Sequence, residues 1–464
     1  MKTQHWIFLS ILLFFLAVQG YLFYYYDYVW WDSGVYLGMA KHLYSSGEVG
    51  LWENIRPPFL PLFLGIFWKA GLPFLLTARV IAILFSLATL FLIYKLGKQF
   101  SGWSVGTLSV ALLATSATYL FLSSQVLSDI PSLLLALLGI LFLIQEHTFF
   151  SGLFIGLSFL TRFPQGFMLC VAGAYLLLSL AQKQQTLKEF LRKTVFLGTG
   201  FALPIFIYLI TNKVYFHSFL GPIFHAMEVI QTAPPNYVDI RYFYLVFLFL
   251  QIYLFPFAVV SIYDSMRKKR YSTLILLLLP CVFYFIYFAL KESREPRYLL
   301  IFLPYLCILT AQGLEYTFSR RRWIIAQLIL VSVIISLLFL RHTLSQPLTD
   351  FGPYNAVEYK QLAREHYSFL SEPGFVLTTH PALAAFTDHK LLVMYREPFD
   401  EAYGKYFRRS GVKYAYINEC DLVCYDDSEK CLKDRTDFIY YMTHNHLLLN
   451  RTYGQCRYYL IKKA

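Results

Sequence analysis

Apolar residues in this chain come in long, nearly unbroken stretches that short polar loops separate. A helix needs about 20 apolar residues to cross a bilayer core of ~30 Å. The pattern therefore predicts eleven membrane-spanning helices, at residues 5–24, 73–94, 103–122, 130–145, 149–163, 164–181, 194–212, 242–262, 272–290, 298–316 and 323–341.

The apolar stretch at residues 59–70 differs from these, because it has only twelve residues, contains Pro61 and carries Lys69 near its end. Such a length favours an interfacial or re-entrant helix over a span. We place this helix in a large first outer loop, residues 25–72.

Basic residues predict the orientation of the chain. Loops on one side carry thirteen lysines and arginines, whereas the opposite loops at 213–241 and 291–297 carry five. Basic residues are enriched in cytoplasmic loops, so the N-terminus is predicted to be cytoplasmic. An odd number of spans then places the segment after residue 341 on the outer face.

That last segment has a different pattern. Short β-type runs at 375–379, 391–394, 412–417 and 457–461, with a helical stretch at 355–370, predict a small α/β domain. The chain is thus expected to divide into a membrane module, 1–341, and an exoplasmic domain, 342–464.

Four of the seven cysteines lie in the predicted exoplasmic domain: Cys420, Cys424, Cys431 and Cys456. On an oxidising face they predict up to two disulfides, whose pairing the sequence leaves open. Their spacing does not match the tight pairs of a zinc site, which makes zinc the minority interpretation.

Composition agrees with a polytopic membrane protein. Of 464 residues, 57% are hydrophobic and only 15% are charged, whereas an ordinary soluble domain has about 25% charged residues. This excludes a soluble multidomain enzyme and a disordered chain. The net charge of +12 indicates topology and contact with anionic lipids rather than nucleic-acid binding.

Asp32 is the first candidate for chemistry, in an aromatic segment just after the first span. A carboxylate in such a setting is partly desolvated and can act as a general base. The alternative is that Asp32 is the N-cap of a helix at 33–45, since Asp is a favoured cap. The sequence does not decide between the two.

Asp129 raises the same question, because it opens the span at 130–145 and Pro131 follows early in that helix. The predicted topology puts Asp129 on the same face as Asp32. Two carboxylates converging on one membrane face are a pair that a transferase can use.

Cations on the outer face are candidates for binding phosphate. Arg56 precedes Pro57 and Pro58, near the headgroup plane, where a guanidinium can hold a phosphate in bidentate fashion. A lipid-facing arginine that snorkels to the interface is the alternative. Arg162 lies between two short spans, and an ionisable residue at membrane depth is a functional candidate.

The loop at 291–297 adds Lys291, Arg294 and Arg297, which can neutralise a phosphate leaving group or simply form a salt-bridged loop. His217 is a weaker candidate, since a histidine without a matched carboxylate is usually structural. The sequence contains no phosphate-binding P-loop, Gly-x-Ser-x-Gly elbow or His-Glu-x-x-His motif, which argues against an ATP-driven transporter and a zincin protease.

The order of these motifs resembles the GT-C superfamily of membrane glycosyltransferases. Within it, the chain is most similar to the branch containing dolichyl-phosphate-mannose-protein mannosyltransferases and lipid A aminoarabinose transferases. The resembling segments, in chain order, are Asp32 with Tyr36 and Ala40, Arg56-Pro57-Pro58, Ala78-Arg79, Leu127 to Pro131, Gly156 to Arg162, Arg297-Tyr298 to Pro304, and Gly411 to Ile417.

The resemblance implies an α-helical polytopic fold of GT-C type with a small exoplasmic α/β domain. It also implies that Asp32 is the catalytic carboxylate, that Asp129 supports it, and that Arg56 meets the donor phosphate. We assign the other site residues by this scheme, with Arg162, Lys291, Arg294 and Arg297 on the phosphate and Tyr36, Tyr298 and His217 on substrate. Ile55 stands where some relatives have an acidic residue, so no metal ligand is assigned and a divalent cation is left open.

The expected reaction is inverting transfer of a hexosyl or pentosyl group from a polyprenyl-phosphate donor, without a nucleotide. The acceptor is a protein, lipid or glycan at the outer face of the cell membrane. The alternative is a transporter or flippase of lipid-linked sugars. We see no internal repeat, and the polar candidates gather on one face, both of which favour the enzyme.

Overall fold

The computed structural model describes residues 2–26, 28–232, 253–290, 295–345, 354–355, 374–394, 407, 411–422, 424, 429–444, 446–453 and 456–463. The chain forms two compact units. The first comprises residues 1–24, 54–59 and 80–345, and the second comprises residues 25–53, 60–79 and 346–464. The predicted domain boundary near residue 342 stays a prediction, but contacts group the first outer loop, except residues 54–59, with the C-terminal segment.

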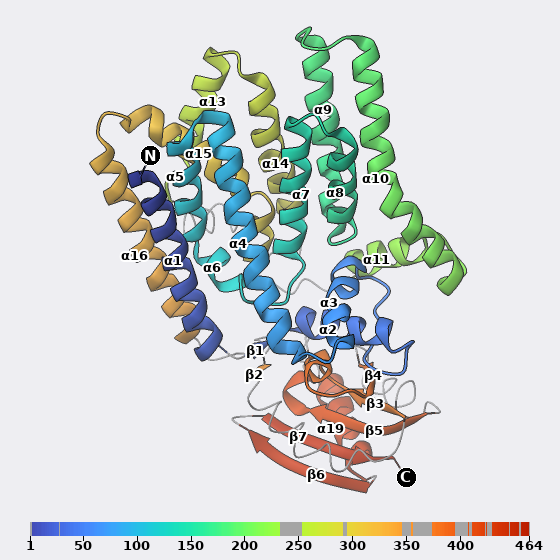
Figure 1. Cartoon of the computed structure of the whole chain (residues 1–464). Helices are drawn as coiled ribbons and strands as arrows, with labels where there is room; N and C mark the ends of the chain where they lie inside the picture. Colours follow the sequence, from blue (N-terminus) through green and yellow to red (C-terminus); the bar gives the residue numbers. More distant parts are fainter. Residues whose placement is uncertain are drawn as a thin grey trace. The chain divides into compact units, whose positions relative to one another are not determined.

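The first unit is made of helices that run side by side over much of their length (Figure 1). They are α1 Lys2–Tyr25, α4 Phe74–Ser101, α5 Trp103–Ala114, α6 Ala117–Leu122, α7 Asp129–Ile144, α8 Thr148–Phe159, η1 Phe163–Gly166, α9 Phe167–Ala181, α10 Leu187–Phe216, α11 Gly221–Thr232, α13 Phe257–Arg267, α14 Tyr271–Ala289, η2 Pro296–Ile301, α15 Leu303–Phe318 and α16 Arg322–Ser345. The η elements are short 3₁₀ helices.

Six of the described helices are long and apolar enough to cross a membrane. They begin at Trp6, Phe74, Phe163, Leu187, Tyr271 and Arg322. The prediction of a helical polytopic fold is therefore confirmed. All eleven predicted spans overlap a described helix, although residues 242–252 lie outside the described part, and the count of eleven stays a prediction.

The predicted span at 103–122 is not one continuous helix, because it is broken between α5 and α6. Thr115 and Ser116 lie at the break, where Ser116 has an extended backbone. The Thr115 hydroxyl donates a hydrogen bond back to the Ala111 carbonyl. Hydroxyl side chains that bond the preceding turn in this way compete with the helix ladder.

Close packing of α8 on α10 depends on small residues. A Cβ atom added at Gly152 would lie 2.0 Å from the Leu197 carbonyl oxygen, and one at Gly200 would lie 2.1 Å from that of Phe149. No larger residue fits at either position. Glycines at helix contacts, which let backbones approach, are typical of membrane helix pairs.

In its described residues, the second unit contains a five-stranded mixed sheet, the two-stranded sheet β1-β2 and the α-helices α2, α3 and α19. Its elements are α2 Trp31–Tyr44, α3 Phe59–Lys69, β1 Tyr28–Val29, β2 Tyr354–Asn355, β3 Phe375–Thr378, η3 Pro381–Ala385, β4 Lys390–Val393, β5 Val412–Asn418, η5 Glu419–Asp421, α19 Glu429–Thr443, β6 His446–Tyr453 and β7 Cys456–Lys462. The strand order is β4-β3-β5-β7-β6, with β3 parallel to β4 and β5, and β7 antiparallel to β5 and β6.

Helices cover both faces of this sheet. Residues Tyr414 and Tyr416 of β5 pack with Val35 and Met39 of α2. The alternate residues of the strands form a second cluster with Phe438 of α19 and its neighbours. Successive side chains of a strand point to opposite faces, so the alternation explains how one sheet holds α2 on one side and α19 on the other.

The four predicted strand runs correspond to β3, β4, β5 and β7, which confirms the predicted α/β pattern. The helix α19 and the strand β6 were not predicted, and the predicted helix at 355–370 lies outside the described residues. Two disulfides are present, Cys420–Cys456 and Cys424–Cys431. They confirm that the four cysteines of this segment pair, and they supply the pairing.

Candidate active site

Asp129 is the first residue of α7 and is almost wholly buried, with 1% of its surface exposed. Ser128 occupies the N-cap position. The alternative interpretation, in which Asp129 is the N-cap of this helix, is therefore wrong. Its Oδ1 lies 3.0 Å from a terminal guanidinium nitrogen of Arg162. Within the described part of the chain, neither carboxylate oxygen accepts a hydrogen bond, so the charge of Arg162 is its main compensation.

Arg162 lies in an extended conformation between α8 and η1. Pro164 at the start of η1 prevents α8 from continuing in register, because proline has no N–H for the helix ladder. The Arg162 guanidinium also lies over the ring of Tyr298, 5.5 Å from its centre. A cation within about 6 Å of an aromatic face is attracted by the ring.

Arg297 approaches the same ring, with its guanidinium 5.7 Å from the ring centre of Tyr298. Arg297 also forms an ion pair with Glu295. Two arginines therefore share one tyrosine, and each has a carboxylate partner. A phosphate that binds Arg297 has to exchange with Glu295. The ion pair agrees with the salt-bridged loop that the sequence analysis gave as the alternative for residues 291–297.

Arg56 belongs to the same unit. Phe59, three residues further on, donates its backbone N–H to the carbonyl of Leu160 at 3.1 Å. This bond ties the Arg56-Pro57-Pro58 segment to the end of α8, two residues before Arg162. Arg56 itself is half-buried. The first unit thus gathers Arg56, Asp129, Arg162, Arg297 and Tyr298 on neighbouring segments.

Asp32 and Tyr36 lie in the second unit, on α2. Trp30 is the N-cap residue of α2 and Asp32 is the second helical residue, so the interpretation of Asp32 as the N-cap is wrong. A carboxylate in the first turn still interacts favourably with the helix dipole. Asp32 is 9% exposed and Tyr36 is 2% exposed.

The C-terminal segment holds the first turn of α2 in place. A Cβ atom at Gly34 would lie 2.5 Å from the carbonyl carbon of Pro381, so α2 and η3 are in backbone contact. Trp31 meets the His380 ring edge-on at 4.9 Å between centres. The sequence analysis did not identify His380. Its position just before Pro381 could have indicated it as a helix cap, because proline is common at the first position of a helix.

An ion pair between a buried lysine and an exposed aspartate fixes the other end of α2. Lys41 is 3% exposed, and its ammonium lies 2.8 Å from Oδ1 of Asp388 and donates to the Thr387 carbonyl at 3.0 Å. Burial lowers the pKa of Lys41, although Asp388 partly offsets this. Sequence reasoning missed this pair as well, since the two residues are far apart in the chain.

Three candidates remain outside this picture. Lys291 and Arg294 lie outside the described residues. His217 is an exposed residue that ends α10 in a left-handed conformation, with a φ of 55°, and no contact joins it to Asp129 or the arginines among the described residues. No group of three His, Cys, Asp or Glu side chains suited to a metal ion occurs in the described part of the chain.

Comparisons with known proteins bear on the membrane unit and on the whole fold. Residues 55–211 match the family model described as dolichyl-phosphate-mannose-protein mannosyltransferase, a segment that includes Arg56, Asp129 and Arg162. No curated protein sequence is a significant match for the chain.

The fold is similar to several solved structures. ArnT from Cupriavidus metallidurans bound to undecaprenyl phosphate has 12% sequence identity and a TM-score of 0.66, over 97% of each chain. The archaeal oligosaccharyltransferase AglB from Archaeoglobus fulgidus, in complex with an inhibitory peptide and a dolichol-phosphate, has 13% identity and a TM-score of 0.57, over 97% of this chain and 74% of that one.

A third similar structure is the arabinofuranosyltransferase AftD from Mycobacteria, with 13% identity and a TM-score of 0.56. This match covers 99% of the chain described here but only 40% of AftD. At identities this low, the structural similarity establishes a shared fold and nothing more. All three matches extend over 97% or more of the present chain.

Proposed function

The chain has the fold of the GT-C glycosyltransferases, and on that premise we propose that it transfers a sugar from a polyprenyl-phosphate donor to an acceptor. The observation that carries the proposal is the buried pair of Asp129 and Arg162 beside Tyr298 and Arg297. This cluster places charged side chains at the membrane helices, where the protein has to bind the phosphate of a lipid-linked donor.

Two of the similar structures support the choice of donor. ArnT was solved with undecaprenyl phosphate, and AglB with a dolichol-phosphate and a peptide. A polyprenyl-phosphate donor therefore fits the cations described above, because their positive charge can bind its phosphate. The acceptor is a protein, lipid or glycan, and the sugar is a hexose or pentose.

The reaction we propose is a single displacement. An acceptor hydroxyl attacks C1 of the sugar, the bond from C1 to the donor phosphate oxygen breaks, and configuration at C1 inverts. Asp32 takes the proton of the attacking hydroxyl as a general base. Its nearly buried position in the first turn of α2 suits this role, because partial desolvation makes a carboxylate a stronger base.

Charge on the leaving group is the second requirement. Polyprenyl phosphate departs with an additional negative charge, which Arg56 and Arg297 stabilise by charge-assisted hydrogen bonds. Arg162 is ion-paired with Asp129 and Arg297 with Glu295, so phosphate binding at Arg297 requires exchange with Glu295. Tyr36, Tyr298 and His217 are proposed to contact the substrates, and Lys291 and Arg294 to add positive charge.

The location we propose follows from the basic residues of the loops. The N-terminus is cytoplasmic, and the first outer loop and residues 342–464 lie on the exoplasmic face of a cell membrane. The lipid tail of the donor stays in the bilayer while its phosphosugar reaches the outer face.

The experiment that tests the function is mass spectrometry of polyprenyl-phosphate sugars and cell-envelope glycans in a strain lacking this gene. We expect one polyprenyl-phosphate sugar to accumulate and one class of acceptor to lack a single sugar. Restoring wild-type protein should reverse both changes, whereas Asp32→Asn should not. A transporter predicts instead that donor accumulates on the cytoplasmic face and that purified protein transfers nothing.

A further inference from the structure

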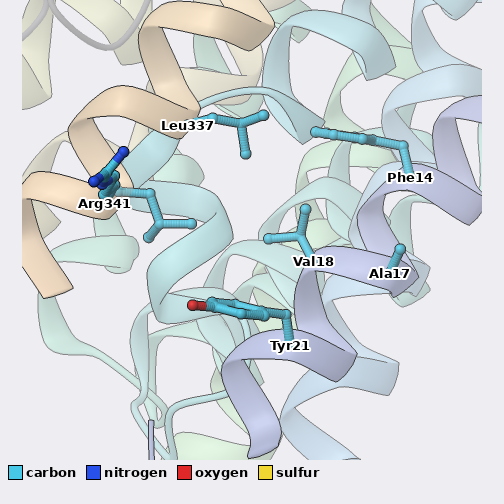
Figure 2. A pocket seen from close by; sticks show the side chains of 7 residues that line it. Phe14, Ala17, Val18, Tyr21, Leu337 and Arg341 are labelled. Atoms are coloured by element: carbon cyan, nitrogen blue, oxygen red, sulfur yellow. The ribbon is translucent and has the colours of Figure 1, made fainter. Parts of the chain in front are cut away.

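A groove runs between α1 and α16 of the membrane unit, away from the residues assigned to the reaction. Its outer part has a volume of about 620 Å³. Figure 2 shows Phe14, Val18 and Tyr21 of α1 facing Leu337 and Arg341 of α16 across this space. The lining is apolar except at the end that Tyr21 and Arg341 occupy.

A second cavity of about 300 Å³ continues the groove along the same two helices. It shares Phe14 with the first and adds Ile7 of α1 and Ile329 of α16. Its lining contains two hydroxyls, Ser10 and Thr115. Each already donates to a carbonyl of its own helix, Trp6 and Ala111 respectively. The groove therefore offers an apolar surface over most of its length.

The length of the groove favours a polyprenyl lipid over a glycerophospholipid. From residue 7 to residue 21 of α1 there are fourteen steps of 1.5 Å, or about 21 Å. One leaflet of the hydrocarbon core is about 15 Å deep. An acyl chain of a glycerophospholipid is confined to one leaflet, whereas a polyprenyl chain extends beyond it.

Arg341 lies where a lipid headgroup is found. Arg322 and Arg341 bracket residues 323–340, which carry no charge. Nineteen helical steps separate the two arginines, about 28 Å, which matches the thickness of the hydrocarbon core. Arg341 is exposed, and no carboxylate of a described residue forms an ion pair with it.

We propose that the α1–α16 groove binds one molecule of polyprenyl phosphate, with its phosphate on Arg341 and its single tail along Val18, Phe14 and Ile7. The proposal rests on the proposed function, which releases polyprenyl phosphate at each turnover. None of the residues assigned to the donor lines this groove. It is therefore a second lipid site, where the spent carrier is held beside the enzyme.

The test uses the purified full-length chain in nanodiscs of phosphatidylcholine with a photoreactive undecaprenyl phosphate. Mass spectrometry of cross-linked peptides should find the probe on α1 and α16. Arg341→Gln should lower this labelling about tenfold or more, because it removes a charge-assisted bond to phosphate. Ala17→Trp, which fills the groove, should lower it to a similar extent.

Leu16→Trp is the matched control for bulk, because Leu16 neighbours Ala17 but is 41% exposed and does not line the groove. Its labelling should equal that of wild type. Unchanged labelling in both Arg341→Gln and Ala17→Trp would overturn the proposal. Displacement of the probe by phosphatidylglycerol as readily as by undecaprenyl phosphate would also overturn it, since the groove would then hold any anionic lipid.

The two proposals fail separately. If α1 and α16 are labelled as expected but the chain transfers no sugar from any polyprenyl-phosphate donor, the groove stands and the proposed function fails. If sugar is transferred and Arg56→Ala abolishes labelling near Arg162 while α1 and α16 stay unlabelled, the groove fails and the proposed function stands.

Discussion

The ion pair of Asp129 and Arg162 affects the free energy of unfolding, because breaking it leaves a charge buried without a partner. Asp129 is buried and Arg162 is 14% exposed at its side chain. We predict that Arg162→Gln lowers the free energy of unfolding by about 3–5 kcal/mol, because it leaves a buried carboxylate without its cation. Thermal unfolding of the detergent-solubilised chain measures this.

The double variant Arg162→Gln, Asp129→Asn should lose less stability than the sum of the single variants, since neither charge is then stranded. Lys193→Gln is the control, because it breaks the ion pair of Lys193 with the exposed Glu146. An exposed pair of this kind contributes about 0–1 kcal/mol. Additive effects of the two buried substitutions would contradict the account.

Residues in apolar surroundings were the predictable part of the site. Asp129 and Arg162 stand out in the sequence because charge is rare at membrane depth. Pairing was not predictable, since Arg162 reaches Asp129 through the tertiary packing of α8 on α7. For the same reason, the sequence could not show that Glu295 pairs with Arg297, nor that one tyrosine, Tyr298, lies under two arginines.

At the scale of elements, His380 connects β3 to the short helix η3. Its Nδ1 accepts the backbone N–H of Ala382 at 3.0 Å, which requires the neutral ring. Burial holds the pKa of His380 well below its usual 6.5. The unfolded chain therefore binds the proton more readily, so the stability from the neutral ring is present above pH 6.5 and is lost as the pH falls below it.

We predict that residues 374–394 lose hydrogen-exchange protection between pH 7 and pH 5, by up to about 1.4 kcal/mol per pH unit. His380→Asn should remove this loss, because the amide oxygen still accepts from Ala382 but does not titrate. His444→Asn is the control, since His444 is exposed at the end of α19. A pH slope that persists in His380→Asn would contradict the assignment.

Element boundaries show where sequence reasoning stops. The predicted helix starts were off by one or two residues, because Trp30 and Ser128 occupy the cap positions without the side-chain bonds that make a cap recognisable. The break at Thr115 was missed because both halves are equally apolar. Strand β6 was missed because its apolar residues Leu447 to Leu449 are consecutive rather than alternating.

At the scale of the molecule, the predicted topology puts α2 and the C-terminal sheet on the exoplasmic face. We predict that an impermeant thiol reagent labels Glu48→Cys and Lys413→Cys in intact cells, since both positions are exposed. Gln184→Cys, between α9 and α10, should react only after the cells are opened. Labelling of one outer position without the other would contradict the eleven-span arrangement.

The central claim is tested most directly by sugar transfer in detergent, where a transporter has no compartments to work between. Purified chain, synthetic polyprenyl-phosphate sugars and envelope extract from the deletion strain supply enzyme, donor and acceptor. We predict release of polyprenyl phosphate with sugar on the acceptor, and turnover about 10²–10⁴-fold lower in Asp32→Asn. Glu48→Gln, an exposed carboxylate of the same loop, should behave as wild type. No transfer by wild type, or near-normal turnover in Asp32→Asn, would contradict the account.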